Sequence, residues 1–312
     1  MDQNSNLAWI NGNFIPQSEA AITLHDAGFV MGATVTDMSR SFAHKPFMLK
    51  EHIQRFMAHC EACFISIKIN EVEFLKAAEE LIERNCLLLK PNEDLALVLL
   101  ATPGPIGFYL GEPGGAGDSL PTLGMHTFKL PFHRYRPWVE HGVELLTSSI
   151  LQPSPLSINP SIKQRSRMHW WIAEREVKKR SARAMALLLD ENGFLTETAS
   201  SNLIILQDAS KSGADLKILT PKPEKVLDGI GLRIVKSFAR DCGFSWIESD
   251  ILPADVKPED AAIITSNSFC FAPVKSINGI QLSRFKWFNE KLLGYWQKQV
   301  HLDFHDQILK NL

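Results

Sequence analysis

Hydrophobic and polar positions in the first hundred residues change from a strand pattern to a helical pattern. The pair Asn11-Gly12 lies between two apolar stretches, which is the strongest short signal for a β-hairpin. Residues 34–50 carry β-branched and apolar positions broken by Ala43-His44-Lys45, which predicts a second hairpin. Apolar residues then recur every three or four positions, which predicts two amphipathic helices, and residues 95–100 predict a buried strand. The helical positions are Ile53, Phe56, Met57, Cys60 and Phe64, then Phe74, Ala77, Ala78, Leu81 and Ile82.

The second half of the chain alternates predicted strands and helices after a Gly/Pro-rich loop at residues 104–117. Met168, Trp171 and Ile172 begin an amphipathic helix, and another helix follows residues 228–231. A hairpin is predicted around the turn Glu191-Asn192-Gly193. The other predicted elements are strands at 143–148, 202–206 and 261–265 and a C-terminal helix at 285–300.

The length of 312 residues favours two domains of a globular protein, because single cores stop growing at about this size. We expect an N-terminal α/β domain at residues 1–130, a linker at 131–141 and a C-terminal domain at 142–312 that binds a cofactor. A net charge of −2 provides no basic field for nucleic acid or an anionic membrane. The composition therefore favours small-molecule chemistry.

Five cysteines without the spacing of a secreted scaffold, and a start without a basic and then apolar segment, favour a cytoplasmic protein with free thiols. No apolar run reaches the roughly 20 residues of a membrane-spanning helix. Cys60 and Cys63 form a CxxC without a second pair, so buried helix thiols are favoured over zinc. We expect no metal site.

Lys163 and Glu197 form a pair with a specific chemical use. A lysine amine can hold an aldehyde cofactor as a Schiff base. A carboxylate beside the ring nitrogen of that cofactor keeps the nitrogen protonated, so that the ring can absorb electrons from a carbanion. The pair suggests a pyridoxal phosphate enzyme, although either residue alone could be structural.

A phosphate requires backbone N–H groups at the start of a helix, hydroxyl groups and usually an arginine fork. Gly229, Ile230 and Gly231 lead into a predicted helix, and Ser266-Asn267 follow a predicted strand. Arg55 lies between apolar positions of its helix. Each of these residues alone fits a turn glycine, a loop serine or a solvated arginine, and their combination with Lys163 and Glu197 favours the cofactor.

The combination resembles the class IV aminotransferases, a family of pyridoxal phosphate enzymes that includes branched-chain and D-amino acid aminotransferases and aminodeoxychorismate lyase. The resemblance covers nearly the whole chain. It implies an α+β, fold type IV protein with a small N-terminal α/β domain, a larger domain with a β-barrel-like sheet flanked by helices, and a homodimer. The motifs that carry it are Asp26-Ala27-Gly28-Phe29 through Gly32, His52-Ile53-Gln54-Arg55-Phe56, Lys163, Glu197 with Asn202, Gly229-Ile230, Thr265-Ser266-Asn267, Pro273-Val274 and Ile277-Asn278-Gly279.

The resemblance also implies a role for each matching residue. Lys163 would hold the cofactor and then move the proton as general base and acid, and Glu197 would pair with the pyridine nitrogen. The phosphate would be held by Arg55, the amides of Ile230 and Gly231 and the Ser266-Asn267 loop, with Leu227 behind the ring. Family members commonly have Thr where Gly231 stands, so we expect weaker phosphate binding.

Other departures from the family lie on the expected substrate side. Met168 replaces a frequent tyrosine, Ile106 an arginine that grips a carboxylate, and Met38 a reactive threonine of the lyase. Thr36 stands at an aromatic position of the branched-chain enzymes. Arg40 could bind a substrate carboxylate or could instead pair with Asp37 or Glu51, so Thr36, Arg40 and Ile106 are the candidate substrate residues.

Three functions follow from these residues. The first is transfer of an amino group between an amino acid, or an amine, and a 2-oxo acid. The second is a lyase of the aminodeoxychorismate type. It is favoured by His52-Ile53-Gln54-Arg55 and by Ser166-Arg167 after Lys163, and it is weakened by Met38 and Ile106. The third is a cofactor-binding protein of the same fold with little turnover, which intact Lys163 and Glu197 argue against.

Overall fold

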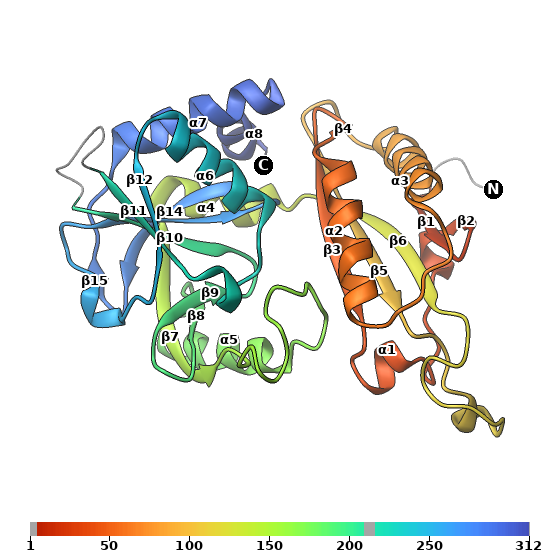
Figure 1. Ribbon diagram of the computed structural model, residues 1–312. Helices are drawn as coiled ribbons and strands as arrows, with labels where there is room; N and C mark the ends of the chain where they lie inside the picture. The colour runs from red at the N-terminus through yellow and green to blue at the C-terminus, as the bar shows by residue number, and fades with distance from the viewer. Residues whose placement is uncertain (1–4, 209–215, 312) are drawn as a thin grey trace. The chain divides into compact units, whose positions relative to one another are not determined.

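The computed structural model describes residues 5–208 and 216–311, and the chain divides into two compact units. Unit 1 comprises Met1–Leu130 with Ile162–Ser166, and unit 2 comprises Pro131–Ser161 with Arg167–Leu312 (Figure 1). The short segment that carries Lys163 therefore belongs to unit 1, although the chain on both sides of it belongs to unit 2. The domain boundaries expected above stay a proposal.

Unit 1 contains a six-stranded antiparallel sheet in the order β2-β1-β6-β5-β3-β4. The predicted hairpin at Asn11-Gly12 is confirmed, and both residues have positive φ, 46° and 94°. Such a turn matches the twist of paired strands and suits glycine best. The strands are β1 (Leu7–Ile10), β2 (Asn13–Pro16), β3 (Val35–Phe42), β4 (Lys45–Pro46), β5 (Leu95–Thr102) and β6 (Thr122–Lys129).

Helices α2 (Leu49–Ala62) and α3 (Glu71–Cys86) pack against one face of this sheet (Figure 1). Their buried apolar residues share a core with Val35, Leu97 and Leu99, so the odd-numbered positions of β3 and β5 face the helices. The even-numbered positions face the other way. Phe64 was expected in this core but lies beyond the end of α2 with 92% of its surface exposed. The remaining helical segments of unit 1 are α1 (Ala27–Val30), η1 (Gln17–Glu19) and η2 (Gly107–Leu110).

Unit 2 contains a barrel-like sheet. Strand β9 pairs with β8 on one side and with β10 on the other, which closes the ring β10-β13-β14-β7-β8-β9. The pairing of β9 with β10 is between Glu197 and Asn202, so the ring closes at the predicted cofactor carboxylate. The strands are β7 (Val143–Leu151), β8 (Met185–Leu189), β9 (Leu195–Thr198), β10 (Asn202–Gln207), β11 (Lys217–Pro221), β12 (Ser245–Ser249), β13 (Ala261–Ser266), β14 (Cys270–Ile277) and β15 (Ile280–Gln281).

The helices of unit 2 differ from the sequence predictions at two places. Residues expected in the linker form helix α4 (Phe132–His141), which packs against β14 and α8. In α5 (Met168–Arg180) the predicted apolar residues Met168, Trp171 and Ile172 are exposed, and Trp170, Ala173 and Val177 are buried instead. The other helical segments are α6 (Ile230–Asp241), α7 (Lys286–Val300), α8 (Phe304–Lys310), η4 (Pro223–Lys225) and η5 (Pro253–Asp255). Across residues 5–208 and 216–311, no helix has the length and apolar character needed to span a membrane.

Candidate active site

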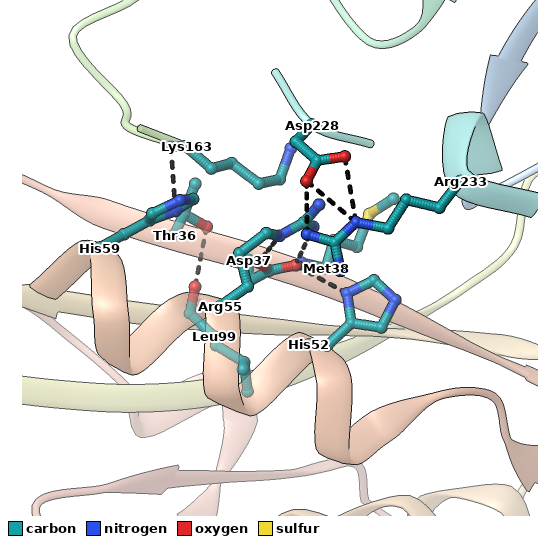
Figure 2. A network of polar contacts seen from close by, with 10 residues as sticks. All are labelled: Thr36, Asp37, Met38, His52, Arg55, His59, Leu99, Lys163, Asp228 and Arg233. Atoms are coloured by element: carbon teal, nitrogen blue, oxygen red, sulfur yellow. Dashed lines mark hydrogen bonds and ion pairs between the residues drawn. The ribbon is translucent and has the colours of Figure 1, made fainter. Parts of the chain in front are cut away.

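The backbone of Lys163 is held on two sides within unit 1. Gln164 forms an antiparallel bridge with Val35, and the N–H of Thr36 donates to the carbonyl of Lys163 at 2.9 Å. The N–H of Lys163 donates to Nδ1 of His59 on α2 at 3.2 Å (Figure 2). A strand and a helix of one unit therefore fix the position of the predicted Schiff-base lysine.

Asp37 on β3 locks the side chain of Arg55 on α2. Nε of Arg55 donates to Oδ2 of Asp37, and Nη2 donates to Oδ1, each at 2.8 Å. This fork is the strongest form of arginine–carboxylate pairing. Asp37 is fully buried and the Arg55 side chain is 8% exposed, so water competes little with the pair. The guanidinium predicted to bind phosphate is thus held in one orientation (Figure 2).

His52 lies one turn before Arg55 on α2 and also contacts Asp37. Its Nδ1 lies 2.8 Å from Oδ1 of Asp37, and because an ionised carboxylate only accepts, Nδ1 is the donor. Burial would raise the pKa of Asp37, but the hydrogen bonds from His52 and Arg55 and the charge of Arg55 hold that pKa well below its ordinary value. Burial lowers the pKa of His52, against the opposing effect of Asp37. The cluster is therefore a neutral histidine, a carboxylate and a guanidinium.

Glu197 in unit 2 is a buried carboxylate with three neutral N–H donors. Its Oε2 accepts from the side chain of Asn202 and from the backbone of Leu227, both at 3.2 Å. Its Oε1 accepts from Nε2 of Gln152 at 3.3 Å. Asn202 also donates to the carbonyl of Leu227 at 2.8 Å, which ties the Leu227 loop to the barrel. These bonds orient the carboxylate without neutralising its charge.

The start of α6 provides backbone N–H groups for an anion. Gly229 is the residue before the helix and offers no side chain, so the first N–H groups of α6 lack a side-chain cap. A Cβ at Gly229 would come within 2.2 Å of Oδ1 of Asn202, and a Cβ at Gly231 would come within 2.5 Å of Oγ1 of Thr265. Both glycines are required by close packing of this turn.

The packing around Gly231 explains why this chain lacks the threonine that is common in the family at this position. The space that a threonine side chain would occupy at this position already holds the hydroxyl group of Thr265. That hydroxyl donates to the carbonyl of Cys270 at 2.7 Å. The neighbouring Ser266 is buried, with its Oγ 3.2 Å from Oγ of Ser268. The backbone of Ser266 lies beside Gly231 at the start of α6. This turn of unit 2 therefore brings together N–H and hydroxyl groups of the kind that a phosphate requires.

The family model described as amino-transferase class IV matches residues 34–277. The chain belongs to this family. A Methanocaldococcus jannaschii protein assigned as a branched-chain-amino-acid aminotransferase is 26% identical over 96% of this chain and 95% of its own length. A D-alanine aminotransferase of Staphylococcus epidermidis is 28% identical over 87% of this chain and 89% of its own length.

A solved structure confirms the fold of this class IV aminotransferase. The branched-chain amino acid aminotransferase of Thermoproteus uzoniensis, solved with norvaline, aligns with a TM-score of 0.79 at 18% identity, over 95% of both chains. The predicted two-part α+β architecture with a barrel-like sheet is therefore confirmed. At this identity the comparison concerns the fold alone.

The candidate substrate residues of this aminotransferase lie in unit 1. Thr36 is buried, and its hydroxyl donates to the carbonyl of Leu99 at 2.8 Å. Ile106 is 2% exposed at the start of η2. Arg40 has no exposed surface; its Nε donates to the carbonyl of Ser41 at 2.9 Å, and its Nη2 lies 3.8 Å from Asp94. The expected partners of Arg40 were wrong, and its burial argues against contact with a substrate carboxylate.

The structure adds supporting roles that the sequence did not assign. Asp37, His52 and His59 hold Arg55 and Lys163 in unit 1, and Gln152 holds Glu197 in unit 2. A signal for two of them was present, because His52 and His59 recur with Arg55 at helical spacing on one face of α2. No group of His, Cys, Asp and Glu that could hold a metal occurs in the described ranges.

Proposed function

We propose that this protein is a pyridoxal phosphate-dependent aminotransferase that moves an amino group between an amino acid and a 2-oxo acid. The observation that carries the proposal is the fixed backbone of Lys163, held by Thr36 and by His59 on the helix that also presents Arg55. A lysine that forms a covalent bond with a cofactor requires such fixed geometry. Family membership supplies the reaction class.

The residues present fit the cofactor in both units. Lys163 would hold its aldehyde carbon, Arg55 and the first N–H groups of α6 would hold its phosphate, and Glu197 would hold its ring nitrogen protonated. When bound, pyridoxal phosphate supplies an electron sink for the substrate carbon that loses its proton. Leu227 would pack against the ring, and Ser266 and Asn267 would add polar contacts to the phosphate. The donors around Glu197 maintain the orientation that this pairing needs.

Lys163 would also move the proton. Once the incoming amino group has displaced it, Nζ of Lys163 becomes a free amine that accepts the proton from the substrate carbon and returns it at a neighbouring atom. The backbone bonds to His59 and Thr36 stay in place during this step, because they involve only the peptide groups of Lys163. The resemblance further implies a homodimer, which light scattering of the purified protein would test.

The direct test is a panel of amino donors and 2-oxo acid acceptors. Purified protein with pyridoxal phosphate should be yellow, an amino donor should bleach the colour, and a 2-oxo acid should restore it. Lys163→Ala should abolish both changes, and Lys178→Ala, on the exposed side of α5, should leave them intact. Pyruvate release from aminodeoxychorismate without an acceptor would identify the lyase instead, and colour without bleaching by any donor would contradict turnover.

A further inference from the structure

The segment between η4 and α6 in unit 2 carries Leu227, whose N–H and carbonyl both bond to the predicted ring-binding part of the site. The N–H of Leu227 donates to Oε2 of Glu197 at 3.2 Å. Its carbonyl accepts from the side chain of Asn202 at 2.8 Å and from the N–H of Gly229 at 2.9 Å. Residues 226–228 belong to no helix or strand, so the position of Leu227 depends on the contacts of its neighbours.

Lys225, two residues before Leu227, joins this segment to two carboxylates. Its Nζ donates to Oδ1 of Asp250 at 2.7 Å and to Oδ2 of Asp190. The side chain of Lys225 is 15% exposed and that of Asp190 is 3% exposed, so water competes little with this pair. Burial alone would lower the pKa of Lys225, but its bonds to Asp190 and Asp250 raise that pKa above its ordinary value. Lys225 is therefore a charged and mostly buried link between three parts of the chain.

Asp190 is itself held in place by the turn that it begins. Its Oδ1 accepts from two N–H groups of the turn, each at 2.9 Å, those of Asn192 and Phe194. The turn connects β8 with β9, the strand that carries Glu197. The segment is thus attached to one hairpin at two points, through the side chain of Lys225 at the turn and through the backbone of Leu227 at Glu197.

Lys222 lies on the same segment and provides an internal comparison. Its Nζ donates to Oδ2 of Asp250, and its side chain is 39% exposed. Without Lys225, Asp250 would keep Lys222, whereas buried Asp190 would lose the cation that pairs with it. A buried charge that loses its partner is strongly destabilising. Loss of Lys225 should therefore release the segment from the hairpin, and loss of Lys222 should not.

We propose that Lys225 is a positioning residue, which holds Leu227 against Glu197 so that the ring-binding part of the cofactor site is formed before the cofactor binds. Lys225 acts through Leu227 and needs no contact with the cofactor or the substrate. A site that is ordered in advance binds more tightly, because less freedom is lost on binding. This inference rests on the proposed function, because it assumes that Glu197 pairs with the ring nitrogen of pyridoxal phosphate.

Hydrogen exchange of the cofactor-free protein tests this positioning without turnover. Lys225→Met removes the charge and keeps an unbranched side chain, and it should speed amide exchange at residues 226–229 about 10-fold. Lys222→Met, the matched control, should speed it less than about 3-fold. Exchange in β13 should stay slow in both variants, which shows that the barrel is folded.

Fluorescence titration of the cofactor-free protein with pyridoxal phosphate gives a second readout. Lys225→Met should raise the dissociation constant about 5- to 30-fold, and Lys225→Arg, which can still pair with both carboxylates, should stay within about 3-fold of wild type. In a Glu197→Gln background, Lys225→Met should raise the constant less than about 3-fold, because the pairing that Lys225 helps to position is then already weakened. If Lys225→Met does not fold, Asp190→Asn takes its place and should act in the same direction by a smaller factor.

Unchanged exchange and affinity in these variants, or equal effects of Lys225→Met and Lys222→Met, would overturn the proposal. Additive losses in the Glu197→Gln background would also overturn it, because they would show that Lys225 only stabilises the barrel. Protein that binds pyridoxal phosphate but is not bleached by any amino donor would refute the proposed transamination. The exchange and affinity measurements would still decide the role of Lys225 in that case.

Discussion

The Nδ1 atom of His59 accepts a hydrogen bond from the backbone N–H of Lys163 across 3.2 Å. Because Nδ1 accepts, the ring proton of a neutral His59 lies on Nε2. Arg55 lies one turn earlier on the same helix. One helix thus positions the lysine backbone through one side chain and presents the phosphate-binding guanidinium through another.

Replacement of His59 should separate this positioning role from simple packing. His59→Asn places Oδ1 where Nδ1 stood, so it should keep the bond, whereas His59→Leu removes the acceptor. We expect His59→Leu to slow the capture of pyridoxal phosphate by Lys163 about 2- to 10-fold, the effect of one net hydrogen bond. Stopped-flow absorbance would measure the rate, with His133→Leu, at an exposed position of α4, as control. Equal rates for the Asn and Leu variants would refute the assignment.

Asp37 should matter both for folding and for phosphate binding. Asp37→Asn removes the charge that opposes buried Arg55, and breaking a buried ion pair costs about 3–5 kcal/mol of unfolding free energy. Urea unfolding would measure this loss. The matched control is Glu80→Gln, which breaks the exposed pair with Arg84 in the same unit and should cost less than about 1 kcal/mol.

Asp37→Asn should also weaken cofactor binding, because Arg55 loses its fixed orientation. Fluorescence titration of cofactor-free protein with pyridoxal phosphate would give the dissociation constant under conditions where the variant is folded. A variant that unfolds more easily but binds with wild-type affinity would show that Asp37 is only a structural residue.

His52 should make stability depend on pH. Because burial lowers its pKa from the ordinary 6.5, the unfolded chain binds this proton more readily than the folded protein does. Stability should therefore fall as pH drops below 6.5, by up to about 1.4 kcal/mol per pH unit for this one proton. The depressed pKa of Asp37 adds a further loss only below its ordinary value of 3.8.

His52→Asn keeps a donor beside Asp37 and removes the titrating group. Urea unfolding between pH 7 and pH 5 should show a smaller slope for this variant than for wild-type protein. His133→Asn should leave the slope unchanged. Parallel stability curves for His52→Asn and wild-type protein would show that His52 does not become protonated on unfolding in this range.

Gly231 should tolerate no side chain while Thr265 is present. Gly231→Ala brings a Cβ within 2.5 Å of the Thr265 hydroxyl, and such overpacking costs about 1–3 kcal/mol. Thr265→Ala removes the hydroxyl, so the double variant should lose less stability than the sum of the two single variants. Gly294→Ala, at a helical position with open space around it, should be neutral or stabilising by up to about 1 kcal/mol. Additive losses at Gly231 and Thr265 would contradict the steric account.

Local signals predicted much of the fold. The Asn11-Gly12 turn, the buried strand β5 and the helix after Gly229 depend on nearby residues, and all three are confirmed. The linker prediction relied on Pro131 and Pro137, but Pro137 lies inside α4, where tertiary packing outweighs the lost backbone bond. Helix α5 carries several apolar positions, and only packing against β7 and β8 selected Trp170 for the core.

The sequence predicted the residues that carry the chemistry of the site better than it predicted the residues that hold them in place. Lys163, Arg55 and Glu197 have side chains with recognisable chemistry. The partners that their supports contact could not be predicted, because Gln152 meets Glu197 across 45 positions and His59 meets Lys163 across 104. Such contacts exist only after the chain has folded.

The central claim is that Lys163 is the residue that bonds the cofactor. Reduction of the yellow protein with borohydride, followed by proteolysis and mass spectrometry, would locate the covalently fixed phosphopyridoxyl group. The account predicts this group on Lys163, with at most a trace elsewhere, and its loss in Lys163→Ala. A group found mainly on another lysine, or an equal yield from Lys163→Ala, would contradict the account.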